Sequence, residues 1–360
     1  MPPRRPVARA KPKAQPPRRR WLQSLSSALV TLIVIGLVGL GVSVWALRAA
    51  GPKARQGVLT TVIIRKGAGV SEVAGDLAQA GVIRSAAVFI GAAELTRAAP
   101  KLKAGEYAFP SRASLAQVLR KIRSGDIVHH RITIAEGLTS QQAVDLINAT
   151  DVLVGQIPTP PEGSILPETY DVTRGEQRAA VLQKMMDARD RVVSELWAHH
   201  KPGLPFQTAD QAVILASIVE KETALPAERP HVAAVYVNRL RLGMRLQADP
   251  TVIYGITGGL PLGRGIRESE LLAPNPYNTY AVAGLPPGPI ANPGRASLAA
   301  AMDPADSKDL YFVADGTGGH VFAATNEEQA QNVLKWRQIE KDRQQAAALA
   351  AAPPKVFEHR

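Results

Sequence analysis

The chain has 360 residues, enough for one large domain or two modest ones with proper hydrophobic cores. It contains no cysteine, which excludes disulfide frameworks, thiol catalysis and cysteine-ligated metals. The formal net charge of +12 would suit a nucleic-acid binder, but eight of the basic residues lie within residues 1–20, where there is no acidic residue. The basicity therefore belongs mainly to a tail, and we expect no nucleic-acid partner.

An uncharged, apolar segment follows this tail, from Trp21 to Leu47. About 20 apolar residues are enough to cross a bilayer, and Trp21 and Trp45 lie where interfacial anchors are expected. The alternative is a cleaved signal peptide, but the apolar part of such a peptide is typically only about 7–15 residues long. We therefore predict an uncleaved transmembrane helix over residues 21–47, a disordered cytoplasmic tail at 1–20 under the positive-inside rule, and a linker at 48–57.

Two segments, 62–77 and 132–146, repeat one order: a β-rich run, a glycine turn and an amphipathic helix that Ser71 or Thr139 can cap. This order is common in unrelated proteins, so the repeat by itself identifies no fold. Between the two segments the sequence predicts a strand at 105–109 and a helix at 114–122. Residues 58–130 are therefore expected to form a small α+β subdomain, whose strand–helix–helix–strand order looks like the LysM type of glycan-binding domain.

A turn-rich break at 158–163 precedes further helices and strands, and we expect a larger mixed α+β domain over residues 131–345. The fold class is therefore α+β. The glycine-rich run at 315–320 is followed by no Gly-Lys-Ser/Thr, so it predicts a hairpin turn and not a phosphate-binding loop. The pattern predicts a charged helix over 176–200, a hairpin that joins 310–314 to 320–324, a solvated terminal helix over 329–351 and a disordered tail at 346–360.

The helix that begins at Thr208 carries the strongest candidate for a catalytic acid. Thr208 and Gln211 form a capping box, and residues 212–219 are apolar on nearly every face, which predicts a helix buried all round. Glu220 follows at its inner end, where partial desolvation would raise its pKa and keep the proton that a glycosidic leaving oxygen needs. The alternative is that Glu220 begins a solvated turn. Glu222 lies about 200° around the helix from Glu220, so the two carboxyl groups cannot form a facing pair.

A polar stretch with clustered tyrosines follows, in a chain where aromatic residues make up only 5%. Tyrosine rings offer flat faces to pyranose sugars, and amide and hydroxyl groups can bind sugar hydroxyls. The loop at 284–294 is rich in proline and glycine, which suits a preorganised groove; the alternative is a rigid connector. The candidate substrate-binding residues are Asn238, Arg245, Gln247, Asp249, Tyr254, Tyr277, Asn278 and Tyr280.

Several long motifs in this chain resemble those of the MltG (YceG-like) endolytic murein transglycosylases. They are residues 215–223, 237–240, 243–255, 277–280, 284–288 and 311–316, which occur in the family's order, and the likeness covers roughly Val58 to Trp336. A further motif, Glu162-Gly163 with residues 167–170, matches except that Glu168 stands where an aspartate is more usual. The resemblance implies one membrane helix, a LysM-like subdomain and a catalytic domain on the periplasmic side of the inner membrane.

The resemblance also implies a specific reaction. Such enzymes cleave the β-1,4 bond between N-acetylmuramic acid and N-acetylglucosamine without water, leave a 1,6-anhydro end and so terminate nascent strands. The family's catalytic glutamate falls on Glu220, which would protonate the leaving oxygen and then deprotonate the attacking muramyl C6 hydroxyl. The residues alone leave a hydrolytic muramidase open, because Asp249 or Glu222 could serve as a second carboxylate. A non-catalytic glycan-binding scaffold is also open.

No metal or cofactor is expected. The seven histidines include two adjacent pairs, His129-His130 and His199-His200, neither of which has zinc-ligand spacing. The expected partners are the glycan strands of peptidoglycan and the membrane, and the resemblance adds peptidoglycan synthases.

Overall fold

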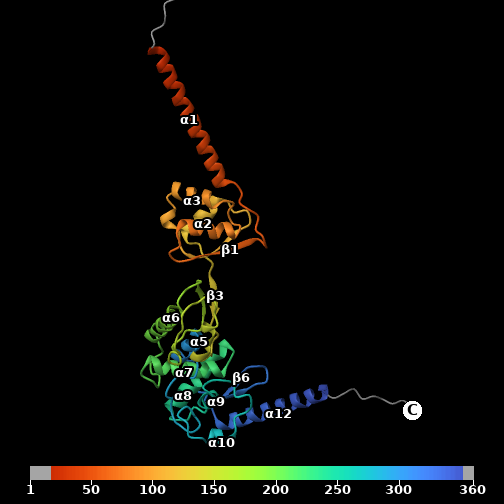
Figure 1. The fold of residues 1–360 in the computed structure, drawn as a ribbon. Helices are drawn as coiled ribbons and strands as arrows, with labels where there is room; N and C mark the ends of the chain where they lie inside the picture. Colours follow the sequence, from red (N-terminus) through yellow and green to blue (C-terminus); the bar gives the residue numbers. More distant parts are fainter. Residues whose placement is uncertain (1–17, 352–360) are drawn as a thin grey trace, which may run out of the picture. The chain divides into compact units, whose positions relative to one another are not determined.

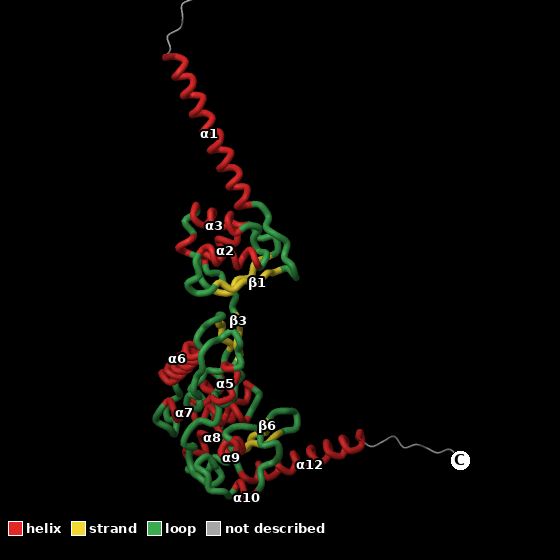
Figure 2. The backbone as a smooth tube through the Cα atoms, viewed as in Figure 1, coloured by secondary structure: helices red, strands yellow, loops and turns green. Residues whose placement is uncertain are grey.

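The computed structural model describes the backbone of residues 18–351, so the predicted cytoplasmic tail, apart from its last three residues, lies outside the described residues. The fold is mixed α+β, as predicted, with short antiparallel strands among helices and loops (Figure 2). The chain divides into two compact units, Met1–Val128 and His129–Arg360. The predicted identities of the domains, LysM-like for residues 58–130 and transglycosylase for 131–345, stay predictions.

The first unit begins with α1, a helix from Arg18 to Arg48 that contains the predicted span at 21–47 (Figure 1). Its part from Leu25 to Arg48 is long and apolar enough to cross a membrane, and apolar side chains there, such as Leu32 and Ile35, are exposed. Length and composition suit either a membrane span or a signal sequence near the N-terminus. The anchor, its orientation and the membrane that it enters therefore stay predictions.

The rest of the first unit is built on a two-stranded sheet. In it, β1 (Leu59–Ile64) pairs antiparallel with β2 (Gly105–Pro110), so that Val62 lies opposite Tyr107. The helices α2 (Val70–Gln79) and α3 (Ala86–Leu95) lie between the two strands in sequence, and α4 (Leu115–Ser124) follows them. The predicted strand–helix–helix–strand order is therefore observed, and the core beneath it includes Phe89, Tyr107, Phe109 and Ile122.

The start of α2 differs from the sequence prediction. The N-cap position is Gly69, with no side-chain cap, so Ser71 already lies inside the helix and does not cap it. A cavity of about 530 Å³ in this unit is lined mostly by apolar side chains such as Trp45 and Val88, with Arg84 and Ser85 among its polar members. It offers no carboxyl group for acid–base chemistry.

The second unit is mainly helical, with two small antiparallel sheets. In one, β3 (His130–Thr133) pairs with β4 (Thr169–Val172); in the other, β5 (Tyr311–Ala314) pairs with β6 (His320–Ala323), which confirms the predicted hairpin. The helices are α5 (Ser140–Asn148), α6 (Arg178–Ala198), α7 (Ala209–Glu222), α8 (Arg229–Arg241), α9 (Asp249–Thr257), α10 (Glu268–Leu271), α11 (Arg295–Met302) and α12 (Asn326–Ala351).

The helix α7 forms the centre of the second unit's core. Thr208 caps it through the predicted capping box with Gln211, and the residues from Leu215 to Val219 are all buried. It packs against α8, and α11 packs against both α7 and α8. The prediction of a helix buried all round is confirmed, because its apolar faces meet neighbours on several sides.

The proline- and glycine-rich loop at 284–294 lies along α7. The N–H of Ile290 donates to Oγ of Ser217 at 3.0 Å, and further along the loop the N–H of Gly294 donates to Glu220 at 2.9 Å. The loop therefore runs in the same direction as the helix and reaches its last turn, where Glu220 lies.

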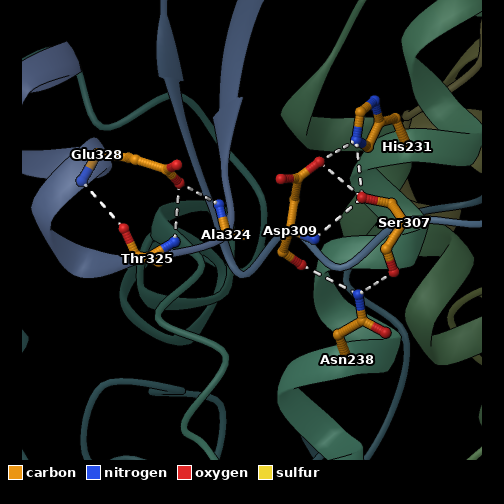
Figure 3. A network of polar contacts seen from close by, with 7 residues as sticks. All are labelled: His231, Asn238, Ser307, Asp309, Ala324, Thr325 and Glu328. Atoms are coloured by element: carbon orange, nitrogen blue, oxygen red, sulfur yellow. Dashed lines mark hydrogen bonds and ion pairs between the residues drawn. The ribbon is translucent and has the colours of Figure 1, made fainter.

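The chain's last described helix, α12, begins at a local cap. Thr325 and Glu328 exchange two hydrogen bonds there, one from each residue's N–H to the other's side chain (Figure 3). The helix starts beside the β5–β6 hairpin and extends away from it (Figure 1). Because it continues to Ala351, the first residues of the tail predicted at 346–360 are helical, and residues 352–360 lie outside the described range.

Candidate active site

Glu220 lies at the end of α7 with its side chain only 4% exposed. Its Oε1 accepts a hydrogen bond from Nη2 of Arg229 at 3.1 Å, and its Oε2 accepts one from the N–H of Gly294 at 2.9 Å. Each carboxylate oxygen therefore has its own donor. Glu220 is not part of a solvated turn, unlike its neighbour Lys221, which is exposed.

Arg229 connects Glu220 to a second carboxylate. It is the first residue of α8, its side chain is 8% exposed, and its Nη2 also lies 3.0 Å from Oε2 of Glu136. The side chain of Glu136, which follows β3 in the chain, is 42% exposed. One guanidinium group thus joins a buried carboxylate to a carboxylate that reaches solvent.

Two glycines lie beside these carboxylates. A Cβ atom on Gly294 would lie 1.9 Å from Oε1 of Glu136, so a side chain there would displace that carboxylate. Gly137 has a φ of +76°, in the left-handed region that favours glycine, and a Cβ on it would lie 3.6 Å from Cγ of Glu220. Main chain therefore borders the two carboxylates directly, and the N–H of Gly294 can reach Glu220.

A second polar cluster surrounds Glu162. Its Oε1 accepts hydrogen bonds from the N–H of Ser140 at 2.8 Å and from Nδ2 of Asn292 at 3.2 Å. The hydroxyl of Tyr254 donates to its Oε2 at 3.4 Å, and the ring centre of Tyr277 is 4.9 Å from that of Tyr254. Burial raises the pKa of Glu162, although the hydrogen bonds from Ser140 act in the opposite direction. Two predicted tyrosines thus lie beside a carboxyl group with a raised pKa.

Asn292 links this cluster to the surroundings of Glu220. It is fully buried, and its Oδ1 accepts from the N–H of Ile165 at 2.9 Å. The backbone N–H of Asn292 donates to the carbonyl of Leu138 at 2.9 Å, and the backbone carbonyl of Asn292 accepts from the N–H of Gly137 at 3.0 Å. Because Gly137 borders Glu220, these bonds tie the two clusters into one hydrogen-bonded frame.

Glu222, the last residue of α7, lies in a different environment. Its Oε1 accepts a hydrogen bond from the hydroxyl of Tyr236. Burial raises the pKa of Glu222 to about 7, and the charge of Asp249 adds to the rise. Glu222 lines a cavity of about 200 Å³ together with Tyr236, Arg239, Leu246, Gln247, Asp249, Tyr280 and Phe312.

The predicted substrate-binding residues divide between these two places. Tyr254 and Tyr277 lie at Glu162, whereas Gln247, Asp249 and Tyr280 line the cavity at Glu222. The helix α9 contributes to both, because Asp249 is its first residue and Tyr254 lies further along it.

The other three predicted residues have different surroundings. Asn238 donates through Nδ2 to the carbonyls of Ser307 and Asp309, as Figure 3 shows. Asn278 is 1% exposed, and its Nδ2 donates to three carbonyls, the nearest that of Ala273 at 2.8 Å. Arg245 is exposed. The amide nitrogens of Asn238 and Asn278 thus hold the main chain, and a role for these three residues in binding substrate stays a prediction.

Three residues of the site were not singled out by the sequence: Glu136, Arg229 and Asn292. Glu136 precedes a glycine, Arg229 precedes Pro230, and Asn292 precedes Pro293 and Gly294. Glycine and proline neighbours mark places where the chain turns or approaches another segment closely, and they are the sequence signal at these three positions.

Comparisons with known proteins support the resemblance. An endolytic murein transglycosylase of Streptococcus pneumoniae serotype 2 is 26% identical over 314 residues, which cover 74% of this chain and 56% of the relative. One of Bacillus subtilis is 34% identical over 178 residues, which cover 49% of this chain and 48% of the relative. The chain therefore spans about half the length of the curated relatives that it matches.

Among solved structures, the crystal structure of a YceG-like protein from Listeria monocytogenes matches with a TM-score of 0.48 at 28% identity, covering 76% of this chain and 98% of that one. The model of the YceG-like family matches residues 62–335, about three quarters of the chain. This chain belongs to the YceG-like family.

Proposed function

We propose that this chain is a peptidoglycan lytic transglycosylase, anchored by α1 in the inner membrane with its second unit in the periplasm. Its substrate is the glycan strand, in which it cleaves the β-1,4 bond between N-acetylmuramic acid and N-acetylglucosamine and leaves a 1,6-anhydro end. Cleavage of this kind terminates the elongation of nascent strands. Peptidoglycan synthases are its proposed partners.

The names of the relatives support this proposal, since both are endolytic murein transglycosylases. The observation that carries it is the position of Glu220. Its side chain is 4% exposed, and both of its oxygens accept hydrogen bonds, from Arg229 and from the N–H of Gly294. A carboxyl group held in one orientation and shielded from water suits proton transfer to a bound substrate.

In the proposed reaction Glu220 acts twice. Its proton passes to the leaving glycosidic oxygen as the bond to C1 breaks, and the C6 hydroxyl of the muramyl residue then attacks C1. The carboxylate of Glu220 takes the proton from that hydroxyl, so the acid is restored and no water is consumed. Tyr254 and Tyr277, whose rings lie near Glu162, would bind the sugar rings of the strand.

A hydrolytic muramidase is the second candidate, and one observation favours it. Glu136 shares Nη2 of Arg229 with Glu220, so the site contains a second carboxylate that is 42% exposed and could activate water. The two reactions differ in product, because hydrolysis adds one water and leaves a reducing end.

A digest of purified peptidoglycan by the full chain in detergent tests the proposal. Mass spectrometry should find anhydro ends; reducing ends would instead support the muramidase, and intact strands a glycan-binding scaffold. Glu220→Gln should abolish cleavage, whereas Glu268→Gln, which changes an exposed glutamate in α10, should leave it unchanged. Equal cleavage by the Glu220→Gln and wild-type chains would remove Glu220 from the mechanism.

A further inference from the structure

The end of α1 is part of the first unit's fold. Leu47 packs against the hydrophobic core of the unit, and just beyond the helix the N–H of Gly51 donates to the carbonyl of Arg112 at 3.2 Å. A Cβ on Gly51 would lie 2.1 Å from the carbonyl oxygen of Ala113, so there is no room for a side chain. The N–H of Arg112 donates in turn to the carbonyl of Pro52 at 2.9 Å. Residues 47–52 therefore join the apolar helix closely to the rest of the unit.

The apolar segment ends beside this junction. Leu25–Arg48 has 24 residues, about 36 Å of helix, whereas the hydrocarbon core of a bilayer is about 30 Å thick. In a membrane, the last turn of α1 would therefore lie between the acyl chains and the headgroups. Trp45, which is 71% exposed, is at this end, and tryptophan is enriched at this interface. Residues that lie next to Trp45 in the fold are expected at the same depth.

The large cavity of the first unit lies next to Trp45. Its volume is about 530 Å³, and its lining includes Trp45, Ala46 and Ala49 at the end of α1, with Ile83 and Val88 from before and within α3. An engineered apolar cavity of about 150 Å³ is large enough to bind benzene. A cavity with more than three times that volume has room for about eighteen carbon atoms, as many as a long fatty acyl chain contains.

One face of α3 extends this apolar lining to the surface. Val88, Gly91 and Leu95 follow one another at spacings of three and four residues, so they lie on one side of the helix. All three are exposed, Val88 by 49% and Leu95 by 70%. Glu94, the only charged residue in the helix, points about 100° away from Leu95. Exposed aliphatic side chains beside a membrane span suit contact with lipid.

Basic residues lie at the same end of α1. Arg84 is exposed and lines the cavity, and its Nη2 donates to the carbonyl of Ala50 at 3.3 Å. A guanidinium group has five N–H donors, so this bond leaves Arg84 able to bind a phosphate as well. Arg48, Lys53 and Arg55, which follow the span in sequence, are also exposed. A cation beside an apolar cavity suits a phosphate ester that carries an acyl chain.

We propose that this cavity binds a membrane phospholipid, with one acyl chain inside it and the phosphate of the same lipid paired with Arg84. The face of α3 formed by Val88, Gly91 and Leu95 then contacts the acyl chains of neighbouring lipids. The lipid belongs to the leaflet in which α1 ends, because Trp45 and Arg84 line one cavity. The location of this site beside the bilayer rests on the proposed function, which anchors α1 in the inner membrane.

Single cysteines test the contact between α3 and lipid, because the chain has no cysteine of its own. A bimane label is attached to the full-length Val88→Cys chain in vesicles of phosphatidylethanolamine and phosphatidylglycerol, and nitroxides on the lipid acyl chains quench any label that touches them. Ile63→Cys is the matched control, since Ile63 in β1 is also 49% exposed. Ile33→Cys, within the span, reports whether α1 is inserted. Quenching at positions 33 and 88 but not at 63 is the expected result.

The label within the span separates the two ways of failing. If position 33 is quenched and position 88 is quenched no more than position 63, the proposed lipid contact is overturned and the anchor stands. If position 33 is not quenched, the anchor falls and the lipid site with it. The cleavage test of Glu220→Gln needs no lipid contact, so the proposed reaction is tested independently.

Native mass spectrometry of the full chain tests the cavity itself, with phosphatidylglycerol as the probe. The wild type should retain one lipid, and Arg84→Gln should lower its affinity about tenfold, because the phosphate loses a charged partner. Ala49→Phe, which places a ring in the cavity, should lower the affinity by at least as much. Lys66→Gln, which removes an exposed cation from the turn after β1, should bind as the wild type does. Equal lipid retention by wild type, Arg84→Gln and Ala49→Phe would indicate adventitious lipid only and overturn the proposal.

Discussion

Glu220 and Glu222 are separated by one residue on α7, yet their carboxyl groups share no hydrogen-bond partner. A helix turns by about 100° per residue, so the two side chains leave it on nearly opposite sides. The two oxygens of Glu220 accept hydrogen bonds from the guanidinium group of Arg229 and from the backbone N–H of Gly294, which hold the carboxyl group in one orientation. Glu222 meets a tyrosine hydroxyl in a cavity where burial favours the protonated acid. Two neighbouring glutamates therefore have different chemistry.

Replacing Arg229 should destabilise the second unit. Arg229→Met leaves the buried carboxylate of Glu220 without its cation, and removing one partner of a buried pair costs about 3–5 kcal/mol. We expect about 3 kcal/mol, because Glu136 can turn to solvent, and a melting temperature lowered by roughly 6–12 °C. Thermal unfolding of the wild-type and Arg229→Met chains in detergent measures this fall in melting temperature.

The matched control for this change is Arg295→Met. Arg295 also pairs with a glutamate, Glu195, at 3.4 Å, but the two side chains are 52% and 64% exposed. Exposed ion pairs contribute about 0–1 kcal/mol, so the melting temperature should hardly change. If the melting temperature falls by similar amounts in the two variants, burial does not make the ion pair of Arg229 and Glu220 more stabilising than an exposed pair.

Adding a methyl group at Gly294 should slow cleavage without unfolding the protein. The new Cβ would lie 1.9 Å from Oε1 of Glu136, so Glu136 must move and give up Arg229. We expect the cleavage rate to fall about tenfold, since small displacements in a catalytic site are costly. The free energy of unfolding should fall by less than about 1 kcal/mol, because Glu136 is partly exposed already.

Gly265→Ala is the control for Gly294→Ala. Gly265 also has no positive φ, and a Cβ on it would meet no atom within 4 Å. Its cleavage rate and stability should match those of the wild type. If Gly294→Ala cleaves peptidoglycan as fast as Gly265→Ala, the position of Glu136 has no part in the reaction.

Local features of the fold were predictable because their causes lie close together in sequence. The capping box of Thr208 and Gln211 sets the start of α7, and Thr139 caps α5 in the same way with Gln142. The hairpin at 311–323 follows from a glycine-rich turn between two β-rich runs. Ser71 failed as a cap because Gly69 has the extended backbone of an N-cap and the helix has already begun at Val70.

The arrangement of the candidate site was less predictable, because it depends on contacts between distant segments. Arg229 and Glu136 are 93 residues apart, and Gly294 is 74 residues from Glu220. The sequence predicts one binding surface over the polar stretch from 238 to 280, whereas in the structure the side-chain amides of Asn238 and Asn278 donate to backbone carbonyls. Whether a polar side chain faces a ligand or its own main chain is decided by packing, which no local pattern reveals.

The apolar helix α1 should remain attached to the mature protein. A tag placed before Met1 should stay on the same polypeptide as the second unit and sediment with membranes after an alkaline wash. Ile33→Arg should weaken insertion by about 2.5–3.5 kcal/mol, because it places a charge near the middle of the span. Val58→Arg, a change at a position beyond the end of α1, should leave insertion unchanged. Loss of the tag from a shortened, soluble chain would identify α1 as a cleaved signal sequence.

The second unit should become less stable at higher pH, because Glu222 then loses a proton that the folded state favours. Its pKa rises from an ordinary value of 4.5 to about 7 because it is buried, with Asp249 adding to the rise. Below pH 4.5 Glu222 is protonated in both the folded and the unfolded chain, so in this range it does not make the free energy of unfolding depend on pH. Between pH 4.5 and 7 the unfolded chain loses this proton while the folded chain keeps it. The stabilisation is therefore lost as the pH rises through the folded-state pKa.

At about 1.4 kcal/mol per pKa unit, the rise from 4.5 to about 7 corresponds to about 3–4 kcal/mol in all, of which about 2–3 kcal/mol is lost between pH 5 and pH 8. Between pH 5 and pH 8 the wild-type melting temperature should fall by roughly 4–12 °C more than that of Glu222→Gln, which cannot ionise. Other titrating groups are common to both proteins and cancel in this comparison. Glu268→Gln, at an exposed position, should behave as the wild type does. If wild type and Glu222→Gln lose the same stability over this range, Glu222 is ionised in the folded protein throughout, and the cavity is lined by two carboxylates instead of an acid and a carboxylate.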